Sequence, residues 1–344
     1  MKTIRKVVDS NVNSQSNYAQ AVDILNAGEV VAFPTETVYG LGAIATDDKA
    51  VKKIFEAKGR PSDNPLIVHI GTKEEAELYI EEIPEAAKKC MDLFWPGPLT
   101  LVMNVKPNIL AKSVTAGLHT VGIRMPDHPV ALQLLQQLKK PLAAPSANRS
   151  GKPSPTEAIH VEEDLQGCIP YILDGGSTGI GLESTVLDVT HEPPVILRPG
   201  GITKEMLEVA IGPVMQPTKV EQSMASTPKA PGMKYTHYAP NAPVYLIDCN
   251  EVIASQAIHK LRTEGQKVAL LAPRNFAKVH ADYFFSIGEE GVKEEMGAAL
   301  YHALRACDKT EATIILVTTT SEEGVGAAIM NRLEKAAAGK RYTV

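Results

Sequence analysis

The sequence predicts an α/β protein with layered α+β character, in which a mostly buried sheet is flanked by helices and a second, smaller domain follows. Two observations carry this prediction. Short apolar, β-branched segments alternate with segments of helical periodicity along most of the chain. At 344 residues the chain is also longer than one hydrophobic core usually serves.

A change of composition divides the chain. Residues 213–242 are rich in Pro, Ser, Thr and Lys and show little periodicity, which is typical of a linker. We therefore predict a first domain at 1–212, a linker at 213–242 and a C-terminal domain at 243–344.

Strands and helices of the first domain are predicted from apolar segments, caps and turn residues. The segment 47–57 is predicted as a helix because Asp residues can cap it and Val51, Ile54 and Phe55 share one face. The glycines of "YGLGA" at 39–43 predict a turn. Strands are expected at 28–34, 65–70, 98–105, 120–125, 141–146, 171–176, 184–190 and 194–200, and further helices at 73–80, 84–94, 127–139, 156–164 and 203–210.

The C-terminal domain alternates strand and helix, which predicts a small parallel, Rossmann-like sheet. Strands are expected at 243–248, 267–273 and 312–320, and helices at 251–264, 290–306 and 323–337. The dinucleotide fingerprint GxGxxG is missing in a suitable frame, so no NAD site is expected.

Composition narrows the class of protein. The chain is 44% hydrophobic and 22% charged, close to ordinary globular proteins, and its net charge of -5 gives no overall attraction for nucleic acid or acidic lipid. The four cysteines are far apart, which favours a reducing cytoplasm over a disulfide framework or a zinc site. The N-terminal residues have no apolar signal segment, and no apolar run is long enough to cross a membrane.

A nucleotide site in this chain would need side chains from separate loops, because the GxxxxGK[ST] motif is missing. Lys58 and Arg60 follow a predicted helix, where a solvated helix end is the ordinary interpretation. Pro61 and Pro65 stiffen this loop, and a lysine, an arginine and Asn64 held in it suit phosphate oxygens.

Other strand ends collect polar residues. Thr35, Glu36 and Thr37 follow the strand at 28–34, a position where α/β sheets bind ligands, although an ordinary turn is equally compatible. His69 lies in the strand "LIVHI", where a core histidine is the common outcome and the wall of a polar pocket is the alternative. Further candidates at strand edges are Thr120, Arg124, Ser146, Asn148, Arg149, Ser150, Lys152, Ser154, Ser184 and Arg198.

Eight blocks in order resemble the YrdC-type threonylcarbamoyl-AMP synthases. They are "FPTETVYGLGA", "KGRPSDNPLIVHI", "WPGPLTLV", "VGIRMPDHP", "APSANRSGKPSPT", "DGG", "ESTVLDV" and "LRPG". The linker "PGMKYTHYAP" and the C-terminal domain resemble the long, two-domain form of this enzyme. The resemblance implies a twisted mixed sheet in a YrdC-like catalytic domain.

The resemblance also implies a reaction. L-threonine, bicarbonate and ATP would give L-threonylcarbamoyl-AMP and pyrophosphate, for the t6A modification at position 37 of tRNAs reading ANN codons. The implied partners are downstream proteins that transfer the threonylcarbamoyl group to tRNA, with tRNA itself contacted indirectly or weakly and no membrane involved.

The family's KxR signature falls on Lys58 and Arg60, which are the implied catalytic residues, and its SxN signature falls on Ser146 and Asn148. The implied threonine site consists of Thr37, His69, Arg124 and Ser184. Tyr235 or Tyr238 of the linker would close over the site. The implied ATP site consists of Lys58, Arg60, Asn64, Thr120, Ala144, Ser146, Asn148, Ser154, Arg198 and Tyr238.

This assignment is chemically coherent. A carbamate carboxylate that attacks the α-phosphate gathers negative charge, which Lys58 and Arg60 could stabilise together with Mg²⁺ bound through ATP rather than through protein side chains. Arg124 would pair with the amino-acid carboxylate, while Thr37 and Ser184 would test the threonine hydroxyl. The sequence leaves the general base open.

Three alternatives stay open at this point. An RNA-binding module is opposed by the acidic net charge and by the lack of an RNP-like aromatic motif. A carbamoyl transferase of the hydrogenase-maturation type would need cysteine pairs that this chain lacks. A regulatory interaction protein fits the C-terminal domain better than the first. For that domain and the linker we expect a role in governing access to the catalytic cleft.

Overall fold

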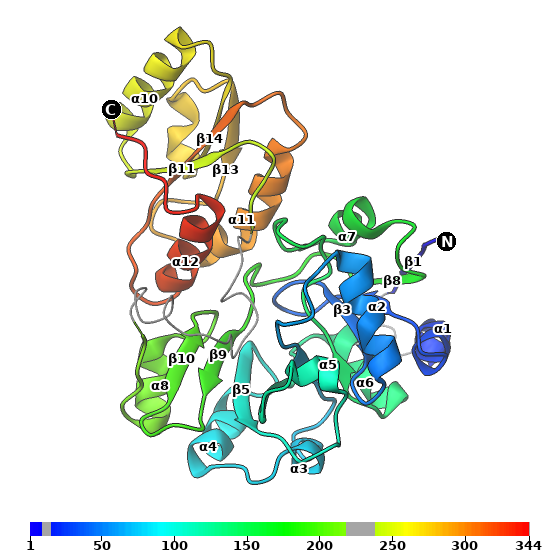
Figure 1. Ribbon diagram of the computed structural model, residues 1–344. Coiled ribbons are helices and arrows are strands. Elements are labelled where there is room, and N and C mark those ends of the chain that lie inside the picture. The colour runs from blue at the N-terminus through cyan, green and yellow to red at the C-terminus, as the bar shows by residue number, and fades with distance from the viewer. Residues whose placement is uncertain (9–14, 218–237, 344) are drawn as a thin grey trace. The chain divides into compact units, whose positions relative to one another are not determined.

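The computed structural model describes residues 1–8, 15–217 and 238–343 (Figure 1). The chain forms two compact units. The first comprises Met1–Ser150, Pro155–Gly179 and Glu183–Lys234, and the second comprises Gly151–Ser154, Ile180–Leu182 and Tyr235–Val344.

The first unit is built on a ten-stranded mixed sheet, which confirms the predicted layered α/β architecture. The strand order is β1-β8-β2-β3-β7-β4-β6-β5-β9-β10. The strands are β1 (Ile4–Val7), β2 (Val31–Phe33), β3 (Gly40–Ile44), β4 (Ile67–His69), β5 (Leu99–Asn104), β6 (Thr120–Arg124), β7 (Leu142–Ala143), β8 (Tyr171–Asp174), β9 (Thr185–Asp188) and β10 (Val195–Arg198).

Eight helices accompany this sheet in the described part of the unit. They are α1 (Gln15–Asn26), α2 (Asp48–Lys58), α3 (Ala76–Tyr79), α4 (Glu85–Phe94), α5 (Lys112–Thr115), α6 (Pro129–Leu138), α7 (Ala158–Leu165) and α8 (Lys204–Ile211). Asp47 caps α2 by accepting from the backbone N–H groups of Lys49 and Ala50, and Gly59 ends it with a φ of 60°. Lys58 is therefore the last residue of α2, directly before the loop that carries Arg60.

Alternation along the strands assigns the two faces of the sheet to two cores. Val31 and Phe33 of β2 pack with α1 and α6, whereas Ala32 between them packs in the larger core. The larger core receives apolar residues from α2, α4, α5, α7 and α8. Helices α1 and α6 lie together against the other face (Figure 1).

A third, small apolar cluster consists of Ile67, Val102 and Val186, with Leu197 against it. These residues come from β4, β5, β9 and β10, and no described helix contributes to the cluster. Because side chains alternate along a strand, His69 shares the face of Ile67. This face of the sheet can therefore present polar groups instead of a helix-covered core.

The prediction of a turn at 39–43 is wrong, since Gly40–Ile44 forms the central strand β3. Gly42 serves close packing there: a Cβ atom on it would lie 2.8 Å from the ring of Phe33. Strand β1 and helix α1 were not predicted. The buried face of α1 rests on Tyr18, Ala21 and Leu25 among polar neighbours, which gives a weak sequence pattern.

The second unit contains a four-stranded parallel sheet, which confirms the predicted Rossmann-like alternation. The strand order is β11-β14-β12-β13. Strand β13 was missed, because it is a short edge strand whose aromatic residues are only partly buried. The elements are β11 (Val244–Ile247), α10 (Glu251–Thr263), β12 (Val268–Ala272), the 3₁₀ helix η1 (Arg274–Lys278), β13 (Tyr283–Ser286), α11 (Lys293–Cys307), β14 (Ile314–Thr318) and α12 (Gly326–Ala336).

Two short segments from the first part of the sequence belong to this second unit. Arg305 of α11 donates to the carbonyl oxygen of Pro153 over 2.6 Å. Gly181 lies so close to α11 that a Cβ atom on it would be 2.5 Å from Cα of Ala298. Helix α11 therefore fixes residues 151–154 and 180–182 through backbone contacts.

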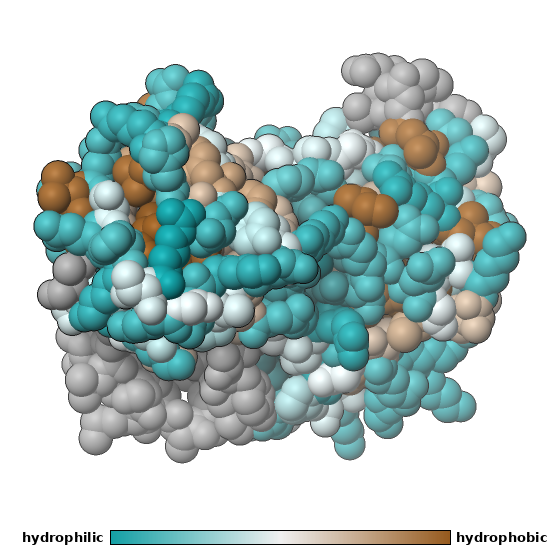
Figure 2. All heavy atoms as spheres, turned by 90° about the horizontal axis from the view of Figure 1, so that it is seen from above, coloured by the Kyte–Doolittle hydropathy of each residue, from teal (hydrophilic) through white to brown (hydrophobic). Residues whose placement is uncertain are grey.

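The surface is mainly hydrophilic on the face that Figure 2 shows, with hydrophobic residues as separate spots. Val209 and Val7 are strongly exposed valines, and they belong to different elements of the first unit. Among the described residues, no helix has both the length and the apolar content that a membrane crossing requires.

Candidate active site

The two lysine- and serine-containing signatures meet in the first unit although they are far apart in sequence. Lys58 Nζ donates to the backbone oxygens of Ser146 and Asn148, over 2.5 Å in each case. The backbone N–H of Ser150 donates to the carbonyl oxygen of Lys58 over 2.9 Å. The end of α2 and the loop after β7 therefore form one structure, with a nearly buried ammonium group at its centre.

Arg60 and Asn64 lie in the loop between α2 and β4. Arg60 Nη2 donates to the carbonyl oxygen of Pro65 over 3.4 Å, which draws the guanidinium back onto its own loop. Asn64 is 1% exposed, and neither its amide nitrogen nor its oxygen has a hydrogen-bond partner among the described residues. Such a group is costly to bury, and it is satisfied when a polar ligand binds.

His69 is a neutral imidazole in the wall of the site. Burial, and then the positive charge of Arg124, lower the pKa of His69 to about 3. In the parallel pairing of β4 and β6, His69 lies opposite Arg124. Its Nδ1 has no hydrogen-bond partner in the described part of the chain.

Arg124 ends β6 and is nearly buried. Its Nε donates to the carbonyl oxygen of Gly97 over 3.2 Å. Its Nη2 lies 2.6 Å from Oε1 of Glu36, which follows β2. The ion pair thus joins residues 35–37, which follow β2, to the neighbouring strand ends that carry Arg124 and His69.

Ser184 connects a second pair of candidates. Its Oγ lies 2.8 Å from Thr100 Oγ1, and Arg198 donates to both its carbonyl oxygen and its Oγ. The structure therefore brings together Ser184, predicted for threonine, and Arg198, predicted for ATP.

Thr37 is completely buried beside Thr35. The two hydroxyl oxygens lie 2.8 Å apart, and Thr35 Oγ1 donates to the carbonyl oxygen of Val38 over 2.7 Å. This local network fixes the turn that places Glu36 between the two threonines.

The remaining predicted site residues lie on other elements of the two units. Thr120 begins β6, at the end opposite Arg124, and Ala144 follows β7 with its N–H bonded to Ile67. Ser154 and Tyr238 belong to the second unit, where Tyr238 stacks on Tyr301 with ring centroids 5.2 Å apart. Tyr235 lies outside the described residues.

Buried polar atoms without a hydrogen-bond partner concentrate around this site in the described structure. They include both amide atoms of Asn64, Nδ1 of His69 and Oε2 of Glu36, while Oε1 of Glu36 and Nη2 of Arg124 have only their mutual ion pair. Native proteins seldom leave such atoms unsatisfied, so their clustering marks the place of a polar ligand. Glu36 follows a predicted strand but is not among the predicted site residues, because the sequence does not show its contact with Arg124.

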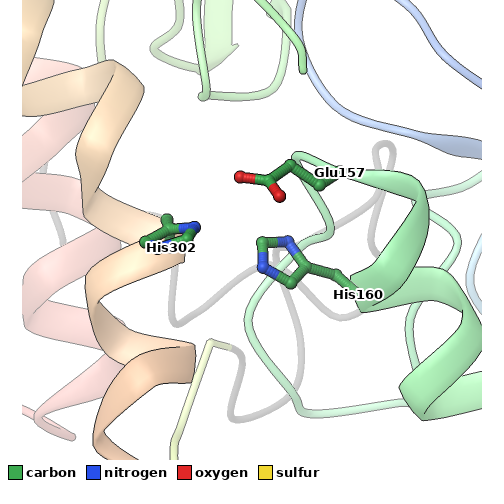
Figure 3. A group of neighbouring side chains, drawn as sticks. All are labelled: Glu157, His160 and His302. Atoms are coloured by element: carbon green, nitrogen blue, oxygen red, sulfur yellow. The ribbon is translucent and has the colours of Figure 1, made fainter. Parts of the chain in front are cut away.

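Two further titratable residues lie at the start of α7 in the first unit (Figure 3). Glu157 is the N-cap residue of α7, and His160 lies in its first turn. Nδ1 of His160 accepts the backbone N–H of Thr156 over 3.3 Å, which gives this buried imidazole a structural role. His302, also labelled in Figure 3, is an exposed residue of α11 in the second unit.

The mixed sheet and its polar face define an α/β protein with a candidate site for a small, charged ligand. The chain belongs to the Sua5/YciO/YrdC family, whose model, described as telomere recombination, matches residues 23–200. Residues 202–338 match a second model, the threonylcarbamoyl-AMP synthase C-terminal domain.

Curated relatives are similar over nearly the whole chain. A threonylcarbamoyl-AMP synthase of Bacillus subtilis is 51% identical, with 99% of each chain covered. A threonylcarbamoyl-AMP synthase of Pyrococcus abyssi is 49% identical, with 92% of each chain covered. The similarity therefore includes both domains.

Solved structures agree with this assignment. P. abyssi Sua5 complexed with L-threonine has a TM-score of 0.93 at 45% identity, and the match covers 99% of this chain and 100% of that one. Escherichia coli YciO, with a TM-score of 0.53 at 24% identity and 58% of this chain covered, shares the fold of the first unit.

Proposed function

We propose that this chain synthesises L-threonylcarbamoyl-AMP from L-threonine, bicarbonate and ATP and releases pyrophosphate. The observation that carries the proposal is the match along the full chain to threonylcarbamoyl-AMP synthases. The fit of both family models, one to each half of the chain, supports it.

We assign the ATP phosphates to the loops that meet around Lys58. Lys58 and Arg60 supply positive charge where the α-phosphate is attacked, and Asn64 supplies amide donors and acceptors. The backbone oxygens of Ser146 and Asn148 hold the Lys58 ammonium in place. Thr120, Ala144, Ser154, Arg198 and Tyr238 complete the proposed ATP set by the family resemblance.

We assign threonine to the C-terminal ends of the neighbouring strands β4 and β6. The guanidinium of Arg124 suits the amino-acid carboxylate, because it is planar and always charged. Neutral His69 can exchange hydrogen bonds with the substrate without adding charge. Thr37 and Ser184 are buried hydroxyls that can recognise the threonine hydroxyl.

The donor set also bears on Mg²⁺. The proposed phosphate site offers cations, hydroxyls and amides, whereas Mg²⁺ prefers carboxylate and phosphate oxygens. We therefore expect Mg²⁺ to be carried by the ATP phosphates and to neutralise charge that develops there.

We further propose that the product serves t6A formation in the cytoplasm, through separate proteins that transfer the threonylcarbamoyl group to tRNA. The four cysteines are free, which fits a reducing compartment.

The test is synthesis by the purified chain without RNA. With ATP, Mg²⁺, bicarbonate and L-threonine, pyrophosphate and L-threonylcarbamoyl-AMP should appear in equal amounts, measured by an enzyme-coupled assay and by mass spectrometry. Pyrophosphate release that requires RNA, or that requires carbamoyl phosphate in place of bicarbonate, would contradict the proposed reaction.

A further inference from the structure

Glu36 is a nearly buried carboxylate that the assignments above leave without a role. It follows β2, and its side chain is 11% exposed, while that of its partner Arg124 is 5% exposed. We propose that Glu36 binds the α-ammonium group of the amino acid and accepts a proton from it during carbamate formation. This inference rests on the proposed function.

The Glu36–Arg124 ion pair is incomplete. A buried ion pair that serves stability normally has its remaining donors and acceptors satisfied by hydrogen bonds, because removing two charges from water is costly. Here Oε1 lies 2.6 Å from Arg124 Nη2, yet no described group makes a regular hydrogen bond to either carboxylate oxygen. Glu36 therefore has acceptor capacity left for a donor that arrives with the ligand.

The charges of Glu36 and Arg124 are complementary to those of an amino acid. A free amino acid carries a carboxylate and an ammonium group on the same carbon atom. Arg124 and Glu36 place a guanidinium and a carboxylate side by side, which is the matching arrangement. His69 is neutral and Lys58 is bound to two backbone oxygens, so neither replaces Arg124 or Glu36 in this pairing.

Two carboxylates lie near Arg124 and His128. Burial lowers the pKa of His128, and the charges of Glu36 and Asp127 oppose this shift. Asp127 is exposed, whereas the side chain of Glu36 is 11% exposed and pairs with Arg124. Glu36 is accordingly the carboxylate that meets a ligand held by Arg124.

The chemistry requires such a group. Threonine enters as an ammonium ion, and its nitrogen must be neutral before it attacks the carbon atom of bicarbonate. The ammonium group first gives one proton to the Glu36 carboxylate, which passes it to solvent. The neutral nitrogen then attacks: the N–C bond forms, one C–O bond breaks, and the leaving hydroxide takes a second proton from nitrogen and departs as water. N-carboxythreonine is left as the nucleophile for ATP.

The test compares two ligands that differ only in the amino group. L-threonine and (R)-3-hydroxybutyrate share the carboxylate and the hydroxyl, and binding of each is measured by calorimetry without ATP. In Glu36→Gln, the preference for L-threonine should fall by about 10- to 100-fold, the usual weight of a charge-assisted hydrogen bond. Glu29→Gln is the control, since Glu29 also pairs with a cation, Lys53, but on the surface.

A second variant and a second reaction keep the test decisive. Glu36→Asp retains the charge and replaces Glu36→Gln if the latter folds poorly. Its preference for L-threonine over (R)-3-hydroxybutyrate should lie between those of Glu36→Gln and the unchanged protein. Formation of ATP from L-threonylcarbamoyl-AMP and pyrophosphate does not use the amine proton, so Glu36→Gln should reduce this reverse reaction much less than it reduces forward synthesis at saturating threonine.

The inference is wrong if Glu36→Gln keeps the ligand preference of the unchanged protein within about twofold, or if forward and reverse reactions fall equally. Failure of the unchanged protein to make L-threonylcarbamoyl-AMP would instead contradict the proposed function. The two failures are therefore distinguishable.

Discussion

The two compact units use buried polar groups differently. In the first unit, Glu36, Asn64, His69 and Arg124 leave buried polar atoms without hydrogen-bond partners around one edge of the sheet. In the second unit, the buried hydroxyl of Thr318 at the end of β14 has no geometric hydrogen-bond partner, and its polar neighbour is the Cys249 thiol. Buried polar atoms without hydrogen-bond partners thus lie mainly where we propose that a substrate supplies the partners.

Glycines serve close packing in two ways in the described residues. Gly42 and Gly122 permit side chains to pack across the sheet of the first unit, since Cβ atoms there would meet Phe33 and Thr100. Gly200 of the first unit and Gly181 of the second unit instead permit backbone contact, since Cβ atoms there would lie 2.2 Å from the backbone nitrogen of Thr185 and 2.5 Å from Cα of Ala298. Close backbone contact at glycine is therefore common to both units.

The largest expected effect comes from removing the ammonium group of Lys58, which contacts the backbone of Ser146 and Asn148. Lys58→Ala should lower pyrophosphate release by about 100- to 1000-fold, because the buried positive charge that we propose to stabilise the reacting phosphate is lost. Steady-state kinetics with saturating threonine would measure it. Lys52→Ala is the matched control on the exposed side of α2, where Lys52 pairs with Asp48, and near-normal turnover is expected.

A smaller effect is expected at Arg124, in the proposed threonine site. Arg124→Lys keeps the positive charge but loses the planar fork that can hold a carboxylate and Glu36 together. The KM for L-threonine should rise about 10- to 100-fold with little change in the KM for ATP. Equal changes in both constants would remove the distinction drawn between the amino-acid edge and the phosphate loops.

The pH dependence of stability tests the neutrality of His69. Its folded pKa of about 3 is below its unfolded value near 6.5, so the unfolded chain binds more protons between these values. Stability should be fully present above pH 6.5 and should fall as the pH decreases, with a loss of about 2 kcal/mol from this group between pH 6.5 and 5. Urea unfolding of His69→Asn at several pH values should show a flatter dependence than the unchanged protein, and an equal dependence would contradict the neutrality of His69.

The smallest effect is expected from a pair of glycine substitutions in the second unit. Gly181 and Gly265 have similar positive φ values of 73° and 77°, but only Gly181 has backbone atoms where a Cβ would lie. Gly181→Ala should therefore lower the free energy of unfolding by about 1–2 kcal/mol more than Gly265→Ala. Equal losses by denaturant unfolding would show that backbone strain alone acts at Gly181.

Much of the fold could be predicted because local rules agree with it. Helix α2 has its Asp47 cap, its apolar face and its terminal Gly59 in the sequence, and the strand and helix alternation of the second unit was correctly identified. Strand β3 failed because Gly40 and Gly42 are needed for packing under Phe33, a long-range reason that a local turn rule cannot include.

The candidate site was predicted mainly through family resemblance, and the roles of its residues stay predictions. Charge and loop position alone made Lys58 and Arg60 reasonable candidates for phosphate. Neither spacing nor composition could place Lys58 on the oxygens of Ser146 and Asn148, or Glu36 beside Arg124, because both contacts depend on sheet order.

The central claim is that separate loops of the first unit bind the nucleotide, while the C-terminal ends of β4 and β6 bind the amino acid. A crystal structure with L-threonine and a non-hydrolysable ATP analogue tests it most directly. We predict phosphate oxygens within hydrogen-bond distance of Lys58 and the threonine carboxylate on Arg124. Nucleotide bound only by residues of the second unit, or threonine bound away from Arg124, would contradict the account.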